Sequence, residues 1–245
     1  MLSLVLSSLI FVAFFVALGV RLVRVFRREG RAPELFIALS FLATSVGITG
    51  QLVAMAPDSP DTTVRIGASL ASVAFFVAGV AVLRFLALAF RAGDRTAEFV
   101  THVGIFFAVV LGGFALGRVV ETPLASLRRF DGAGLGGNAF LCATLAWLTV
   151  EAFLHFGRLR RRSALGLADP VLMNRMLLYG VGSLLSVLTM LSTLVPALAW
   201  GIDPMENPVL RGIGATLGMP IGVIYYLALL PPARYCRWLQ GTAHP

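Results

Sequence analysis

The sequence predicts an all-α polytopic membrane protein in which a bundle of seven transmembrane helices forms a single domain, residues 1–245. The first observation is composition: 58% of the residues are hydrophobic and only 13% are charged, whereas soluble domains carry about 25% charged residues. The second is the presence of seven apolar runs, each long enough to cross a bilayer core of about 30 Å. The third is a regular alternation of charge at the connections between these runs.

The predicted spans follow one another with short connections and no soluble module between them. Arg21, Arg24, Arg27 and Arg28 follow the first run directly, which favours a first spanning helix over a cleaved signal peptide. Asp169 with Pro170, and Asn207 with Pro208, are typical of helix starts and mark the sixth and seventh spans. The spans cover about residues 2–25, 34–56, 65–90, 99–120, 137–157, 170–199 and 208–230.

The connections predict the orientation. Arginines follow the first, third and fifth runs, whereas the second and sixth connections, "APDSPDTT" and "GIDPMEN", are acidic and contain no arginine. By the positive-inside rule the N-terminus lies outside and the C-terminus in the cytoplasm. Arg128 and Arg129 in the fourth connection run against this pattern, and four concordant clusters outweigh them. The tail, residues 231–245, places aromatic and basic residues on different sides and predicts a short amphipathic interfacial helix.

Composition also excludes several function classes. All 20 basic residues are arginine, so a lysine Schiff base with retinal or pyridoxal phosphate is impossible. The arginines stand at the ends of apolar runs, which indicates anionic lipid headgroups at the inner loops as partners and excludes nucleic acid. Cys142 and Cys236 lie in a span and in the tail, so no disulfide framework is expected.

Polar residues recur every three or four positions in three spans, and each set forms one stripe on its helix. Polar atoms facing lipid are costly, so we expect the stripes to face one another or a wet cavity. The stripes are Ser40, Thr44, Gly47 and Gln51 in the second span; Thr144, Trp147, Glu151, His155 and Arg158 in the fifth; and Arg175, Tyr179, Gly182, Ser186, Thr189 and Thr193 in the sixth.

Glu151 is the one acidic residue well inside a span and needs a cationic partner. Glu151, Arg175 and Arg84 all lie roughly 8 to 9 Å below the inner boundary by helix rise. We therefore predict an intramembrane polar network with Arg175 or Arg84 as the partner of Glu151. Such a network either sets helix register or acts as a proton relay, ligand contact or conformational lock. Its members are Glu151, Arg175, Arg84, His155, His102, Asn174 and Tyr179.

Two further groups are candidates. On the predicted outer side a vestibule is expected from Gln51, Arg118, Glu121, Asn138 and Arg211. Glycines four residues apart let helices approach closely or dimerise, and the predicted packing glycines are Gly113, Gly117, Gly214, Gly218 and Gly222.

No catalytic motif appears: the chain has no G-x-S-x-G, no H-E-x-x-H and no paired intramembrane aspartates. An enzyme is therefore the less favoured interpretation, with no catalytic, metal or cofactor residues assigned. His102 and His155 leave a haem-binding redox protein as one alternative.

Three stretches, "GRAPELFIALSFL", "RRSALGLADPVLMNRMLLYG" and "LLPPARYCRWL", resemble boundary motifs of an uncharacterised family of bacterial seven-helix membrane proteins with no assigned activity. The resemblance implies a multi-pass protein of the bacterial inner membrane and supplies no catalytic residue. The favoured hypothesis is a receptor-like or accessory protein whose inner network couples ligand or lipid binding to a cytoplasmic partner. A small solute or proton-coupled transporter is the alternative, and a homodimer fits either hypothesis.

Overall fold

The computed structural model describes residues 2–56, 58–127, 134–163, 165–167, 169–203 and 207–241, and these residues form helices and short connections without any strand. Seven of the helices are long and apolar enough to cross a membrane. They are α1 (Leu2–Glu29), α2 (Ala32–Ala54), α3 (Asp61–Ala89), α4 (Arg95–Glu121), α6 (Leu135–Ser163), α7 (Pro170–Trp200) and α8 (Pro208–Leu229). The prediction of seven spanning helices is confirmed. The short helices α5 (Leu124–Leu127) and α9 (Ala233–Gly241) lie outside this set.

The helix ends are determined by local chemistry. The Asp169 carboxylate accepts a hydrogen bond from the Val171 backbone N–H, and the Asn207 side chain accepts from Val209 and Leu210. Both residues are therefore the N-caps that the sequence indicates. α6 continues to Ser163, six residues beyond its predicted span, because Arg160, Arg161 and Arg162 in the last turn favour the negative end of the helix dipole.

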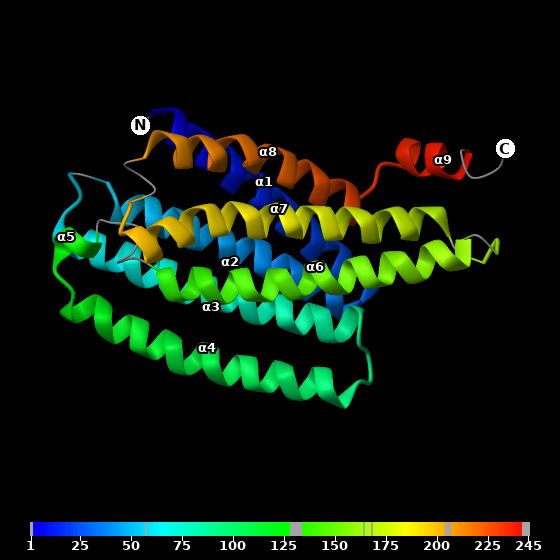
Figure 1. Ribbon diagram of the computed structural model, residues 1–245, viewed down its shortest axis with the longest axis horizontal. Helices are drawn as coiled ribbons and strands as arrows, with labels where there is room; N and C mark the ends of the chain where they lie inside the picture. The colour runs from blue at the N-terminus through cyan, green and yellow to red at the C-terminus, as the bar shows by residue number, and fades with distance from the viewer. Residues whose placement is uncertain are drawn as a thin grey trace.

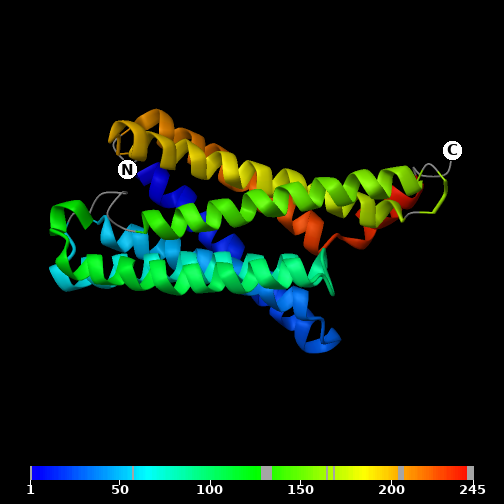
Figure 2. The same ribbon diagram turned by 60° about the horizontal axis from the view of Figure 1, so that its bottom comes forward.

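The two chain termini lie at opposite ends of the long axis of the bundle, as an odd number of crossings requires (Figure 1). The connections after α1, α3 and α6 share one end with α9, and we call this the arginine-rich end (Figures 1 and 2). α5 and the connections α2–α3 and α7–α8 lie at the other end, which we call the acidic end. The charge alternation of the sequence thus becomes a difference between two ends of one bundle.

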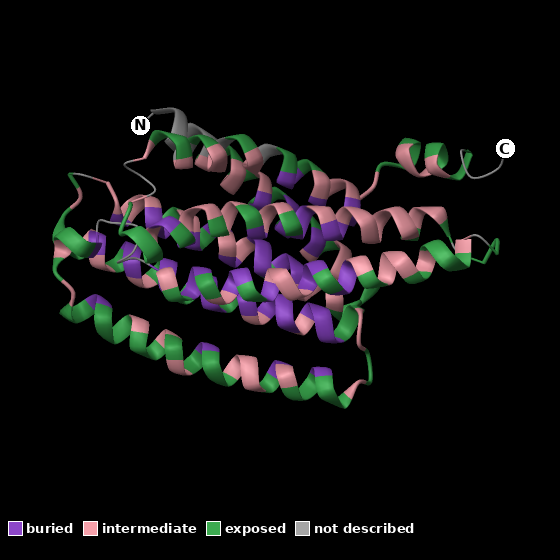
Figure 3. Ribbon diagram, in the orientation of Figure 1, coloured by how far each residue is buried: buried purple, intermediate pink, exposed green. Residues whose placement is uncertain are grey.

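α3 forms the centre of the bundle and α4 its margin. Two thirds of the most apolar stretch of α3 is buried, compared with 11% in α4. α4 packs mainly on α3 and shows long runs of exposed residues along its other sides (Figure 3). Exposed apolar side chains such as Phe99, Phe106 and Phe114 suit a helix surrounded by lipid.

The structure separates the five predicted packing glycines into three groups. A Cβ on Gly218 or Gly222 would lie 3.3 Å from Phe11 or 2.9 Å from Phe14, so these two residues do let α1 pack on α8. A Cβ on Gly214, Gly113 or Gly117 would meet no atom of the described residues within 4 Å. The packing prediction is wrong for Gly113 and Gly117 within one chain, because equal spacing places glycines on one face without providing a neighbouring helix. For Gly214 it stays a prediction, since the side chains of α1 before Ser8 lie outside the described residues.

Candidate functional site: an intramembrane cavity and a separate ionic cluster

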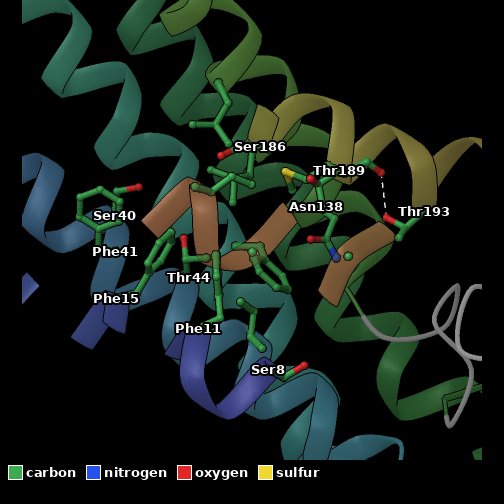
Figure 4. Close-up of a pocket in the computed structure, with 18 of the residues that line it drawn as sticks. Ser8, Phe11, Phe15, Ser40, Phe41, Thr44, Asn138, Ser186, Thr189 and Thr193 are labelled. Atoms are coloured by element: carbon green, nitrogen blue, oxygen red, sulfur yellow. Dashed lines mark hydrogen bonds between the residues drawn. The ribbon is translucent and has the colours of Figure 1, made fainter. Parts of the chain in front are cut away.

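A cavity of about 250 Å³ lies inside the bundle between α1, α2, α3, α6, α7 and α8. Most of its wall is apolar, and hydroxyl groups from α2 and α7 project from opposite sides (Figure 4). These polar groups belong to two of the stripes noted in the sequence. The members that reach the cavity are Ser40, Thr44, Gln51, Ser186, Thr189 and Thr193.

The α7 hydroxyls bond to their own helix and still face the cavity. Ser186 donates to the Gly182 carbonyl at 2.9 Å, and Thr189 donates to the Leu185 carbonyl at 2.8 Å. Since each hydroxyl proton is already used, the oxygen lone pairs remain as acceptors. The α7 side of the cavity therefore offers acceptors to a bound molecule.

Asn138 supplies a donor from the first turns of α6. Its side chain is 6% exposed and belongs to the cavity wall. Its Nδ2 has no hydrogen-bond partner among the described residues. A buried polar group without a partner costs about 1 to 3 kcal/mol, so this amide is suited to donate to a molecule inside the cavity.

Three aromatic rings form the wall of the cavity on the side nearer the arginine-rich end. The ring centroids of Phe15 and Phe41 are 4.8 Å apart, and those of Phe41 and Tyr225 are 5.3 Å apart. Both pairs are edge-to-face, and all three residues are at most 5% exposed. Edge-to-face rings pack well with one another, so this wall separates the cavity from the groups beyond it.

Glu151 lies outside the cavity wall, in a cluster at the arginine-rich end. Its Oε1 accepts hydrogen bonds from Arg91 Nη2 at 2.7 Å and Nε at 3.1 Å, and from the Trp147 indole at 3.2 Å. The residue is 2% exposed, whereas the Arg91 side chain is 40% exposed. A surface arginine thus reaches down to a buried carboxylate, whose Oε2 has no hydrogen-bond partner among the described residues.

Arg91 belongs to the connection between α3 and α4, and Asp94 holds it from the other side. Arg91 Nη1 lies 3.2 Å from the Asp94 carboxylate, which also accepts from the Thr96 backbone N–H as the N-cap of α4. The Thr96 N–H and then Arg91 lower the pKa of Asp94 from its usual value. The connection is therefore tied both to the start of α4 and to the middle of α6.

The predicted partner of Glu151 is wrong. Arg175 donates from Nε to the Ala228 carbonyl at 2.7 Å and so faces α8. No salt bridge among the described residues involves Arg175 or Arg84. All three groups lie at similar depth, but depth does not determine the direction in which a side chain leaves its helix. The sequence signal that was available is the "RAGDR" connection, which the prediction treated only as a charged flank.

The other predicted members of the network divide into separate contacts. His155 Nδ1 lies 3.2 Å from the Glu151 carbonyl, and its ring packs edge-on against Phe90. Tyr179 is buried beside Phe85 and interacts with Arg175. Asn174 donates to the Tyr235 hydroxyl at 2.8 Å and so links α7 to α9.

His102 stands apart from this end of α6. It is exposed on α4, and its Nδ1 lies 2.7 Å from the Glu98 carbonyl of the same helix. The described residues contain no group of three His, Cys, Asp or Glu side chains that could hold a metal ion.

The predicted outer vestibule is only partly assembled. Gln51 and Asn138 both line the cavity. Arg118 and Glu121 are exposed near the end of α4 and do not reach the cavity wall, because α4 packs on the outside of α3. Arg211 belongs to α8, and its side chain lies outside the described residues.

A double-mutant cycle checks the revised pairing. Glu151→Ala is expected to lower the free energy of unfolding by about 1 to 3 kcal/mol, because Arg91 and Trp147 lose a buried acceptor. The effects of Arg91→Ala and Glu151→Ala should be clearly non-additive in thermal or denaturant unfolding. Arg175→Ala is the matched control, and its effect should add to that of Glu151→Ala within about 0.5 kcal/mol. Strong coupling of Glu151 to Arg175 instead would contradict the pairing in the structure.

Comparison of the chain with protein-family models, curated proteins and solved structures gives no match. The resemblance to a family of bacterial seven-helix membrane proteins therefore stays a prediction.

Proposed function

We propose that this protein is a receptor-like membrane protein that binds a small, mostly apolar molecule in the cavity between its helices. The observation that carries the proposal is the buried Asn138 amide in the cavity wall, whose Nδ2 has no hydrogen-bond partner within the described part of the chain. At the packing density of protein interiors, about 0.74, a cavity of about 250 Å³ accommodates roughly ten non-hydrogen atoms. The ligand carries at least one acceptor for Asn138 and is otherwise apolar, like most of the wall.

The proposed orientation in the membrane places the ligand entrance and the partner surface on opposite sides. The positive-inside rule places the arginine-rich end in the cytoplasm of a bacterial cell and the N-terminus outside. Asn138 and Gln51 belong to turns near the acidic end, so the ligand enters from the outer half of the membrane. α9 lies in the headgroup region of the inner leaflet, since Tyr235 and Trp238 stack beside its arginines. The exposed arginines of the inner loops provide the surface for a cytoplasmic partner.

The Glu151–Arg91 cluster acts as the conformational lock in this proposal. It joins α6, which carries Asn138, to the α3–α4 connection at the cytoplasmic end. A ligand shifts an equilibrium only through different interactions with the two states. A tilt of α6 upon ligand binding would change the hydrogen bonds between Glu151 and Arg91. The position of the exposed arginine side chain would then change at the surface that the partner contacts.

Identification of a copurifying ligand tests the proposal. The wild-type protein, purified in mild detergent, is extracted with organic solvent and the bound small molecules are quantified by mass spectrometry. We expect one compound of the described size to be depleted at least about tenfold in Asn138→Leu, a loss of about 1.4 kcal/mol. Asn174→Leu is the matched control, because it removes the same amide far from the cavity wall, and it should retain the compound. The proposal fails if no bound compound depends on Asn138.

A proton-coupled carrier is the second candidate, and two carboxylates favour it. Glu34 and Glu151 each have a buried carboxylate oxygen without a hydrogen-bond partner among the described residues. Such groups in spanning segments often take part in proton transfer. Proton-driven solute flux in liposomes that disappears in Glu151→Gln would favour the carrier over the receptor.

A further inference from the structure

A second concave surface lies on the outside of the bundle, beside the C-terminal half of α1 near the arginine-rich end. Arg21, Arg24 and Arg28 line it together with Leu230 at the end of α8. The three arginines are spaced by three and four residues and so share one side of α1. We call this surface the arginine groove.

The arginine groove contains three positive charges, and no acidic residue is among the described residues that line it. All salt bridges among the described residues involve Arg31 or Arg91. Arg21 is held by a neutral group: its Nη1 lies 3.4 Å from the Tyr226 hydroxyl, and its Cζ lies 5.7 Å from the centre of the Tyr226 ring. Like charges in one groove repel one another, so an anion bound between them is stabilised.

The other part of the groove is apolar. Ala17 and Val20 line it two to three turns before Arg28, which corresponds to a distance of roughly 12 to 17 Å along α1. α1 is one of the helices able to span the membrane, so this apolar part lies at the depth of acyl chains and the arginines at the depth of headgroups. A guanidinium group can donate two parallel hydrogen bonds to two oxygens of one phosphate.

We propose that the arginine groove is a binding site for the phosphate of an anionic phospholipid, with an acyl chain along Ala17 and Val20. The site is distinct from the intramembrane cavity and goes beyond the proposed receptor function. The lipid connects α1 to the end of α8 and so stabilises the arginine-rich end of the bundle.

Native mass spectrometry and thermal unfolding test this site with phosphatidylglycerol, phosphatidylcholine and inorganic phosphate as separate probes. Wild-type protein should retain phosphatidylglycerol and unfold at a higher temperature with it than with phosphatidylcholine. In Arg24→Gln/Arg28→Gln the affinity for phosphatidylglycerol should fall more than about tenfold, because the phosphate loses two of the three guanidinium groups that line the groove. This variant leaves the contact between Arg21 and Tyr226 in place, so folding is preserved.

The matched control is Arg160→Gln/Arg161→Gln, which removes the same charge from exposed residues at the same end of the bundle. It should keep wild-type affinity for phosphatidylglycerol. An equal loss in both variants would mean that net charge alone attracts the lipid and would overturn the site. Equal stabilisation by inorganic phosphate would overturn the lipid as its occupant, as would equal retention of phosphatidylcholine.

Discussion

Replacing Gly214 by leucine is expected to abolish binding of the cavity ligand while the protein stays folded. Gly214 lines the cavity, and a Cβ built on it meets no atom of the described residues within 4 Å. The leucine side chain therefore extends into the space that the ligand occupies. We expect at least about a hundredfold weaker binding, or about 2.7 kcal/mol. The measurement is the amount of the copurifying compound, compared with the thermal stability of the same sample.

Two features make this variant informative. Leucine has a higher helix propensity than glycine by roughly 0.8 kcal/mol, so the apo protein should be at least as stable as the wild type. Gly212→Leu is the matched control, because Gly212 is exposed on the same helix, also has open space beside it, and does not line the cavity. Equal ligand content in wild type and Gly214→Leu would show that the ligand binds elsewhere.

The second large effect is expected where α2 and α3 cross. A Cβ on Gly67 would lie 2.7 Å from the Gly50 carbonyl oxygen and 2.9 Å from the Ala54 nitrogen. These are backbone atoms and cannot rotate away, so Gly67→Ala must push the two helices apart. We expect the free energy of unfolding to fall by about 3 kcal/mol, at the upper end of the range for overpacked cores. Thermal or denaturant unfolding in detergent measures this loss.

Gly113→Ala and Gly117→Ala provide the contrast for Gly67→Ala. Both positions lie in α4, and a Cβ built on either meets no atom of the described residues within 4 Å, so the methyl group extends into lipid. Alanine also favours a helix over glycine by up to about 1 kcal/mol. These two variants should be as stable as the wild type or more stable. A Gly67→Ala protein as stable as they are would mean that α2 and α3 do not approach closely at this point.

The polar stripes were correctly predicted to face the inside of the bundle. Ser40, Thr44 and Gln51 recur at helical spacing, and the cost of polar atoms in lipid predicts that they face inward. The structure places them in the cavity wall opposite the hydroxyls of α7. The pattern left open whether the stripes meet directly or border a cavity, because the volume of a cavity depends on the bulk of Phe15, Phe41 and other residues from helices distant in sequence.

The partner of Glu151 and the close contact between α2 and α3 could not be predicted from such patterns. The rise of a helix gives the depth of Glu151, Arg84 and Arg175, but the rotation of each helix and the path of the α3–α4 connection decide that Arg91 is the partner. Gly50 and Gly67 belong to none of the sets of glycines spaced by four that predict close helix packing. Their importance comes from a crossing of two helices at those two residues.

The sequence alone determined the number, order and approximate ends of the seven spanning helices, because length, hydropathy and cap residues act within one segment. The packing of the helices against one another determines which of their faces meet, which arginine neutralises Glu151 and where a cavity remains. Such pairings depend on side-chain volumes and helix rotations contributed by several segments together, and no single stretch of sequence contains them.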